Sequence, residues 1–305
     1  MQTSSTLRPV AGLALALLTL TGCADRGDAG AGPSATGPAA ESAALPTDGA
    51  GLVLQVEYTG GFVTPEVLAG RMPLVSVYAD GRVITQGPVA AVYPGPAWPN
   101  VQVQQADRST VQELADAALA AGVDETADLG APPLADAPST RFTLVTDSGP
   151  VTREVYALQE AAGAGGLTPE QESARAELQA LFDELTALPQ RLDPHGGGTS
   201  TYEATSVAAL ARPWTGADDG LTSPGGELPE LSWPDVAWPG PALPGEPIGP
   251  GLGCVTATGE QAAALSEAAR AASALTPWVG QDGARWAITF RPLLPDESGC
   301  ADLGD

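Results

Sequence analysis

The sequence contains no lysine: all 13 basic residues in this chain of 305 residues are arginines. This absence excludes reactions that depend on a lysine side chain. A Walker A phosphate loop, a pyridoxal or Schiff-base enzyme and a Ser-x-x-Lys penicillin-binding protein all need that amine. We therefore expect none of these activities.

Histidine is almost as scarce, because His195 is the single one. It begins His195-Gly196-Gly197-Gly198, a pattern similar to the oxyanion motif of lipases and esterases. No second histidine can act as base and no Gly-x-Ser-x-Gly elbow exists, so we interpret the segment as a linker without catalytic residues. One histidine, together with two cysteines that we expect to pair with each other, cannot build the usual zinc site, and we expect no metal and no cofactor.

Positive charge is in short supply. Acidic residues number 37, and the net charge is −24. Nucleic acid would repel such a chain, so we expect no nucleic-acid partner.

The N-terminus has the pattern of an export signal. Arg8 precedes an apolar run from Val10 to Leu20, and the run ends in Leu20-Thr21-Gly22-Cys23. A short positive region, an apolar stretch and small residues before a cleavage site are typical of a secretory signal peptide. We expect that signal to cover residues 1–22. An uncharged stretch of about 14 residues is shorter than the roughly 20 that a spanning helix needs.

Leu20-Thr21-Gly22-Cys23 resembles the lipobox of bacterial lipoproteins. In that family the cysteine becomes the first residue of the mature protein and carries diacylglycerol, which implies a lipid on Cys23 and a place at the extracytoplasmic face of the cell membrane. An ordinary cleaved signal and a retained anchor are the alternatives. The composition and the segment Arg291-Pro292-Leu293-Leu294-Pro295-Asp296-Glu297 also resemble uncharacterised lipoproteins of high-GC Gram-positive bacteria, which imply no activity.

The remaining cysteines are Cys254 and Cys300. If lipid occupies Cys23, they form an even pair, as expected for an oxidising compartment. A Cys254–Cys300 disulfide would close a loop of about 46 residues and contribute roughly 3 to 4 kcal/mol. Two buried free thiols are the alternative.

Composition divides the mature chain. Residues 23–50 are small and polar, which predicts a disordered tether with a reach on the order of 30 Å. An N-terminal module is expected over 51–188, and a Pro- and Gly-rich linker over 189–200. A C-terminal module rich in Pro and Trp, with the one disulfide, is expected over 201–305.

Strand patterns predict short antiparallel hairpins. Residues 52–58 alternate as a half-buried strand does, and 285–291 form the last clear strand. Runs 74–78 and 82–86 flank Ala79-Asp80-Gly81, and runs 142–146 and 151–156 flank Asp147-Ser148-Gly149. Asp-Gly between β-prone runs is a strong hairpin signal.

Three amphipathic helices are predicted, each beginning with a capping box. The pairs are Ser109 and Gln112, Thr168 and Gln171, and Thr258 and Gln261. Pro189 is expected to end the second helix. The fold class is therefore α+β.

A repeated Pro-Gly-Pro-Ala segment, at 94–97 and 239–242, is compatible with two related modules.

The Pro-rich region after residue 212 contains Trp214, Trp233 and Trp238. Indoles between prolines could form an exposed stacking surface for a sugar or peptide, or they could fill a loop-rich core. The core interpretation is favoured.

These observations predict a non-catalytic envelope lipoprotein that displays a binding or scaffold module on the outer face of the membrane. Its partners would be the membrane, through the lipid, and an envelope protein or wall polysaccharide. A secreted-type protease inhibitor and a carboxylate-dependent hydrolase of wall glycans are the alternatives.

Overall fold

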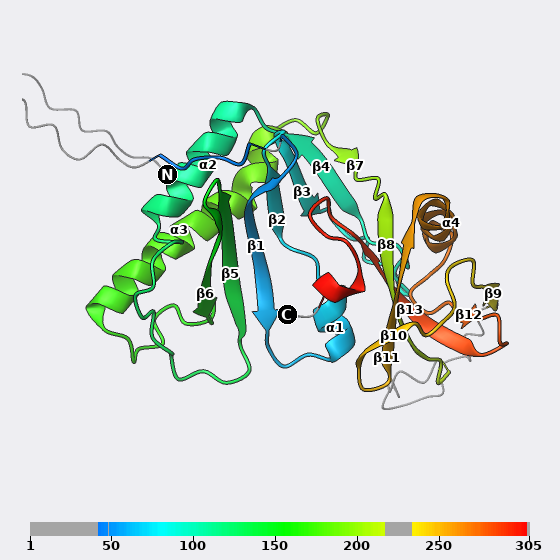
Figure 1. The fold of residues 1–305 in the computed structure, drawn as a ribbon. Helices are drawn as coiled ribbons and strands as arrows, with labels where there is room; N and C mark the ends of the chain where they lie inside the picture. Colours follow the sequence, from blue (N-terminus) through cyan, green and yellow to red (C-terminus); the bar gives the residue numbers. More distant parts are fainter. Residues whose placement is uncertain (1–41, 48, 217–233, 304–305) are drawn as a thin grey trace, which may run out of the picture. The chain divides into compact units, whose positions relative to one another are not determined.

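The computed structural model describes residues 42–47, 49–216 and 234–303, which form a mixed α and β structure with two sheets and four α-helices (Figure 1). The α+β class is compatible with this result. Cys23 and Trp233 lie outside the described residues. The described residues belong to one compact unit.

The first sheet is antiparallel throughout, in the order β6-β5-β1-β2-β3-β4-β7. Its strands are β1 (Leu52–Gly60), β2 (Val75–Tyr78), β3 (Arg82–Gln86), β4 (Val101–Gln105), β5 (Pro138–Thr146), β6 (Gly149–Tyr156) and β7 (Ser200–Thr201).

The turn from β2 to β3 requires its glycine. Gly81 has a φ of +88°, and a Cβ at this position would lie 2.2 Å from the carbonyl oxygen of Ala106. Asp80 closes the turn by accepting a hydrogen bond from the backbone N–H of Arg82 at 3.1 Å. Only glycine combines this conformation with such a close approach.

Helices α2 (Arg108–Ala120) and α3 (Pro169–Leu192) cover one face of this sheet. Their apolar sides share a core with alternate residues of β1, including Leu54 and Val56. Within the described part of the chain, no helix combines the length and the apolar character needed to cross a membrane.

The start of α2 differs from the prediction. Its N-cap is Asp107, whose carboxylate accepts from the N–H of Thr110 at 2.7 Å and from the Ser109 hydroxyl at 2.8 Å. The predicted Ser109–Gln112 capping box is therefore wrong. An acidic side chain two residues earlier provides a stronger acceptor at the positive end of the helix.

The other two predicted caps have different outcomes. The capping box of Thr168 and Gln171 is present at the start of α3. Thr258 is the N-cap of α4 (Gly259–Arg270), but its side chain makes no cap hydrogen bond.

The prediction that Pro189 ends α3 is wrong. The helix continues to Leu192, and the N–H of Asp193 donates to the carbonyl of Pro189 at 3.1 Å. A proline this close to the helix end loses one backbone hydrogen bond, but the last turn still forms.

The second sheet has the order β10-β11-β8-β13-β12-β9, with only the β12–β9 pair parallel. Its strands are β8 (Ser206–Pro213), β9 (Val236–Ala237), β10 (Glu246–Gly249), β11 (Leu252–Thr258), β12 (Trp278–Val279) and β13 (Arg285–Pro292). Helix α4 packs on one face of it, over a core that contains Trp278 and Phe290.

The segment before β4 belongs to this second core. Trp98 is buried against Phe290, with ring centroids 6.2 Å apart, and the guanidinium of Arg270 lies 5.6 Å from the Trp98 ring. Residues from the first half of the chain thus complete the core of the second sheet.

The faces of the two sheets that are not covered by α2, α3 and α4 contact a shared layer. This layer consists of α1 (Pro65–Gly70) and the C-terminal segment from Leu293 to Leu303, which includes the 3-10 turn η1 (Cys300–Asp302) (Figure 1). Glu66 of α1 accepts from Arg212 at 2.9 Å and from the Thr289 hydroxyl at 2.6 Å, both on the second sheet. The short α1 was not predicted.

The two threonine caps allow a matched test. Thr168→Ala removes a cap hydrogen bond and is expected to lower the free energy of unfolding by about 1 kcal/mol. Thr258→Ala removes an exposed N-cap threonine that makes no such bond and should cost clearly less. Urea unfolding followed by circular dichroism measures both. Equal losses would contradict the assignment of the caps.

Candidate functional site

The candidate site is a cavity of about 220 Å³ between the two sheets. Its walls come from three parts of the fold: the end of β1 with the adjacent β5, the helix α1, and the end of β13 with the C-terminal segment that follows it. The charged residues that line it are Glu57, Arg71, Arg141, Arg291, Glu297 and Asp302. Three of the chain's 13 arginines therefore meet at one cavity of a strongly acidic protein.

Strand alternation places Glu57 and Thr59 on this side of the first sheet. Val56 faces the helices α2 and α3, and its neighbours in sequence point the other way, as the two-residue period requires. Glu57 lies 3.7 Å from Arg141, which also bonds Glu154 at 3.1 Å. The polar side of β1, which the pattern of a half-buried strand placed toward solvent, instead lines the cavity.

Arg291 is the most buried charge at the site, with 2% of its surface exposed. It donates to the carbonyl of Pro292 at 2.7 Å and forms an ion pair with Glu297. The second oxygen of Glu297 accepts from the backbone N–H of Leu294 at 2.6 Å. Arg291 and Glu297 therefore fix the chain as it leaves β13.

Two buried polar atoms of residues that line the cavity have no hydrogen-bond partner among the described residues. They are the Nε of Arg291 and the hydroxyl of Thr59, which is 7% exposed. A buried polar atom without a partner costs free energy. Unused hydrogen-bonding capacity in residues that line a cavity is therefore the feature that most directly indicates a ligand.

Burial shifts the acid–base behaviour of the site. It raises the pKa of the Glu57 and Glu297 carboxyls, against the opposing effects of Arg141 and Arg291. Burial also raises the pKa of Tyr202 to about 12, and this hydroxyl donates to the carbonyl of Leu293 at 2.9 Å. Tyr78, whose pKa burial also raises, donates to Asp296.

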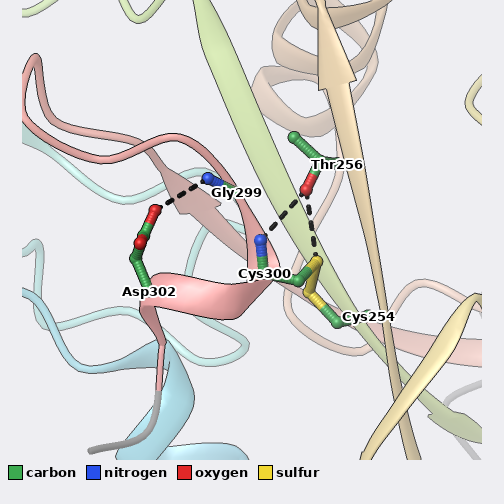
Figure 2. The surroundings of a disulfide bond; sticks show 5 residues. All are labelled: Cys254, Thr256, Gly299, Cys300 and Asp302. Atoms are coloured by element: carbon green, nitrogen blue, oxygen red, sulfur yellow. Dashed lines mark hydrogen bonds between the residues drawn. A yellow bond between two sulfur atoms is a disulfide. The ribbon is translucent and has the colours of Figure 1, made fainter.

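The cysteine pair lies beside this layer. Cys254 on β11 and Cys300 on η1 face each other with a Cα–Cα separation of 6.0 Å, which a disulfide spans (Figure 2). The Thr256 hydroxyl accepts from the N–H of Cys300 at 3.1 Å and lies 3.3 Å from its sulfur. The structure thus contains a disulfide-capable pair, which would tie the C-terminal segment to the second sheet.

Trp238 is not on an exposed surface. It is 6% exposed, its ring packs edge-on against Trp278 at 5.8 Å, and its Nε1 donates to the carbonyl of Pro241 at 2.6 Å. The suggested stacking surface of Trp214, Trp233 and Trp238 is therefore wrong for Trp238, which fills the core as the favoured interpretation expected. Trp214 is half-buried, and Trp233 lies outside the described residues.

The glycines after His195 already have an acceptor. The N–H groups of Gly197 and Gly198 donate to the carboxylate of Asp193 at 2.8 and 3.0 Å, and the Thr199 hydroxyl donates to it at 2.8 Å. These hydrogen bonds lower the pKa of Asp193. Donors that hold a resident carboxylate cannot also stabilise an oxyanion.

Sequence reasoning missed the cavity residues Glu57, Thr59, Arg71 and Arg141. One signal in the sequence could have indicated part of the site. Arginines are few, and one of them begins the segment Arg291–Glu297 that was noted for its resemblance to lipoproteins. In the described ranges, no group of three or more histidine, cysteine, aspartate or glutamate side chains is arranged to hold a metal ion.

No family model, curated protein or solved structure is significantly similar to this chain.

The raised pKa of Glu57 predicts a pH effect on stability. The folded protein binds this proton more tightly than the unfolded chain, so the contribution of Glu57 is most favourable below its ordinary pKa of 4.5 and declines as the pH rises through the raised value. Glu57→Gln removes the titration. Relative to this variant, the wild type should lose stability between pH 4.5 and pH 7.

Urea unfolding at both pH values measures the difference. Glu154→Gln is the matched control, since Glu154 also pairs with Arg141 but is 46% exposed. A wild type that gains stability relative to Glu57→Gln over this interval would contradict the prediction.

Proposed function

We propose that this chain is an exported lipoprotein, anchored by a lipid on Cys23 at the extracytoplasmic face of the cell membrane, and that it binds a partner or ligand without catalysis. The observation that carries the proposal is the cysteine arrangement. Cys254 and Cys300 form a disulfide-capable pair. The one cysteine left over is Cys23, which directly follows the proposed export signal. This usage fits an oxidising compartment and a separate role for Cys23.

The tether expected over residues 23–50 is wrong at its end, because Ala43 is buried in the first core and its N–H donates to Asp116 at 2.7 Å. A tether of residues 23–41 would hold the folded part on the order of 25 Å from the lipid head groups. The net charge of −24 also disfavours contact with anionic lipid. We therefore assign membrane attachment to the lipid, and assign binding of an envelope protein, wall polysaccharide or small ligand to the folded part.

The absence of catalysis is proposed from the state of the carboxylates. A glycan hydrolase needs one carboxyl group to donate a proton and another to act as base or nucleophile. At the cavity, both oxygens of Glu297 already accept hydrogen bonds, from Arg291 and from Leu294. These bonds favour a role in holding the chain over a role in proton transfer.

The inhibitor alternative has one supporting observation. Phe62 is 87% exposed in the loop from β1 to α1, and its N–H donates to the carbonyl of Asp136 at 3.3 Å. An anchored loop with a protruding aromatic side chain could enter a protease specificity pocket. Stoichiometric inhibition of a chymotrypsin-like protease would distinguish this alternative from the proposed function.

The proposal retains two related modules built on short hairpins. In support, β1 lies between β2 and β5, and β8 lies between β11 and β13. In the first sheet α2 precedes β5, which pairs with β1. In the second sheet α4 precedes β13, which pairs with β8. Against simple repetition, Trp98, which follows the first Pro-Gly-Pro-Ala segment, and Trp238, which precedes the second, share one core.

Lipidation is tested by mass spectrometry of the mature protein from its native membrane. The expected N-terminal peptide begins at Cys23 and carries a diacylglycerol mass, and Cys23→Ala should abolish both the lipid and the membrane fractionation. Ala24→Ser, which leaves the cysteine in place, is the control. A mature protein that starts elsewhere, or a bare Cys23 thiol, would overturn the proposal.

The same non-reduced sample tests the pairing. Cys254 and Cys300 should appear in one linked peptide pair, which reduction separates. Two unmodified thiols would remove the compartment argument.

A further inference from the structure

The unused hydrogen-bonding groups of the inter-sheet cavity are mostly donors. The Nε of Arg291 can only donate, and the Thr59 hydroxyl can donate or accept. Arg71 bonds the carbonyls of Tyr58 and Gly60 at 3.2 Å, and both bonds use the same nitrogen, Nη1. Its other guanidinium nitrogens have no hydrogen-bond partner among the described residues. The matching ligand is therefore rich in acceptors.

The ion pairs of the cavity wall also favour a ligand that is rich in hydrogen-bond acceptors. Arg141 is paired with Glu57 and Glu154, and Arg291 with Glu297. Arg71, in contrast, forms no ion pair within the described ranges.

Asp302 also lines the cavity, but it is already engaged. Its Oδ2 accepts from the backbone N–H groups of Ser298 and Gly299 at 2.6 and 3.0 Å, and from the Ser298 hydroxyl at 2.8 Å (the Gly299 bond is drawn in Figure 2). Arg71 is thus the cation of the wall that remains for a ligand.

We propose that this cavity is a binding site for a small organic carboxylate, held by Arg71, by the Thr59 hydroxyl and by the Nε of Arg291. A guanidinium offers parallel N–H groups that match a carboxylate in geometry and charge. The cavity of about 220 Å³ holds a molecule of several non-hydrogen atoms. The inference deepens the proposed function, since it names the ligand class of the binding module.

The site also carries a built-in pH dependence. The charged groups that act on the pKa of Glu57 are Arg141, Arg291, Glu297 and Asp296. Burial raises the pKa of both Glu57 and Glu297, so acid neutralises negative charge on the wall at a higher pH than it would neutralise exposed carboxyls. Affinity for the carboxylate should therefore rise as the pH falls from 7 toward 5.

Calorimetric titration of the purified full chain tests the site with three probes: acetate, succinate and inorganic phosphate. We expect at least one carboxylate to saturate the protein at one site per chain. Arg71→Gln should weaken this binding about tenfold, the size of one lost charge-assisted hydrogen bond. Arg191→Gln, which removes a surface arginine of α3 paired with Glu184, should leave the affinity unchanged.

Thr59→Val provides a second variant that does not depend on an arginine. It replaces an unpartnered hydroxyl with a methyl group of similar shape, so the ligand-free protein should unfold at the same temperature as the wild type or a higher one. The carboxylate affinity should fall. Lower stability with unchanged affinity would show that the hydroxyl is structural and would overturn its role.

The carboxylate site is overturned if neither acetate nor succinate saturates the wild type, if phosphate alone binds, or if Arg191→Gln weakens binding as much as Arg71→Gln does. These results leave lipidation untouched, because the titration does not depend on the lipid. Conversely, a mature protein that lacks the lipid but binds succinate would contradict the proposed lipid anchor and support the carboxylate site.

Discussion

The burial of one arginine is the constraint on which the arrangement of the two sheets depends. Arg291 ends β13 almost without solvent contact, and a charge in that position is tolerated only when it is paired and hydrogen-bonded. Its partner, Glu297, lies six residues later and bonds the N–H of Leu294. The charge therefore forces the chain after β13 to fold back between the sheets, where Tyr78 and Tyr202 bond it from the opposite side.

A polar layer between two sheets has a cost that an apolar one lacks. Guanidinium and carboxylate groups bring more donors and acceptors than the local chain can satisfy, and the Nε of Arg291 and the hydroxyl of Thr59 are the ones left over. Such a layer is weak evidence for stability, because apolar residues of the same volume often serve as well or better. A ligand in the proposed carboxylate site would supply the hydrogen-bond partners that the protein itself does not provide.

The sequence predicted local elements better than their assembly. Helix α3 followed from its capping box and apolar spacing, and β1 from its two-residue alternation, because both signals are local. Helix α1 was missed because its six residues are too few to show a helical period. Glu57 and Thr59 looked like solvent-facing positions, and nothing in the alternation of β1 indicates that a second sheet lies over them. The contact of Trp98 with Phe290 is likewise invisible, because it joins residues almost 200 positions apart.

A double-mutant cycle on Arg291 and Glu297 tests the central claim most directly. The unfolding free energies of Arg291→Met, Glu297→Gln and the double variant give the coupling between the two side chains. The account predicts that each single variant loses about 3 kcal/mol or more and that the double variant loses much less than their sum. The same cycle on the exposed pair Arg285 and Asp235 should give a coupling below about 1 kcal/mol. A coupling at Arg291 and Glu297 as small as that of the exposed pair would contradict the account.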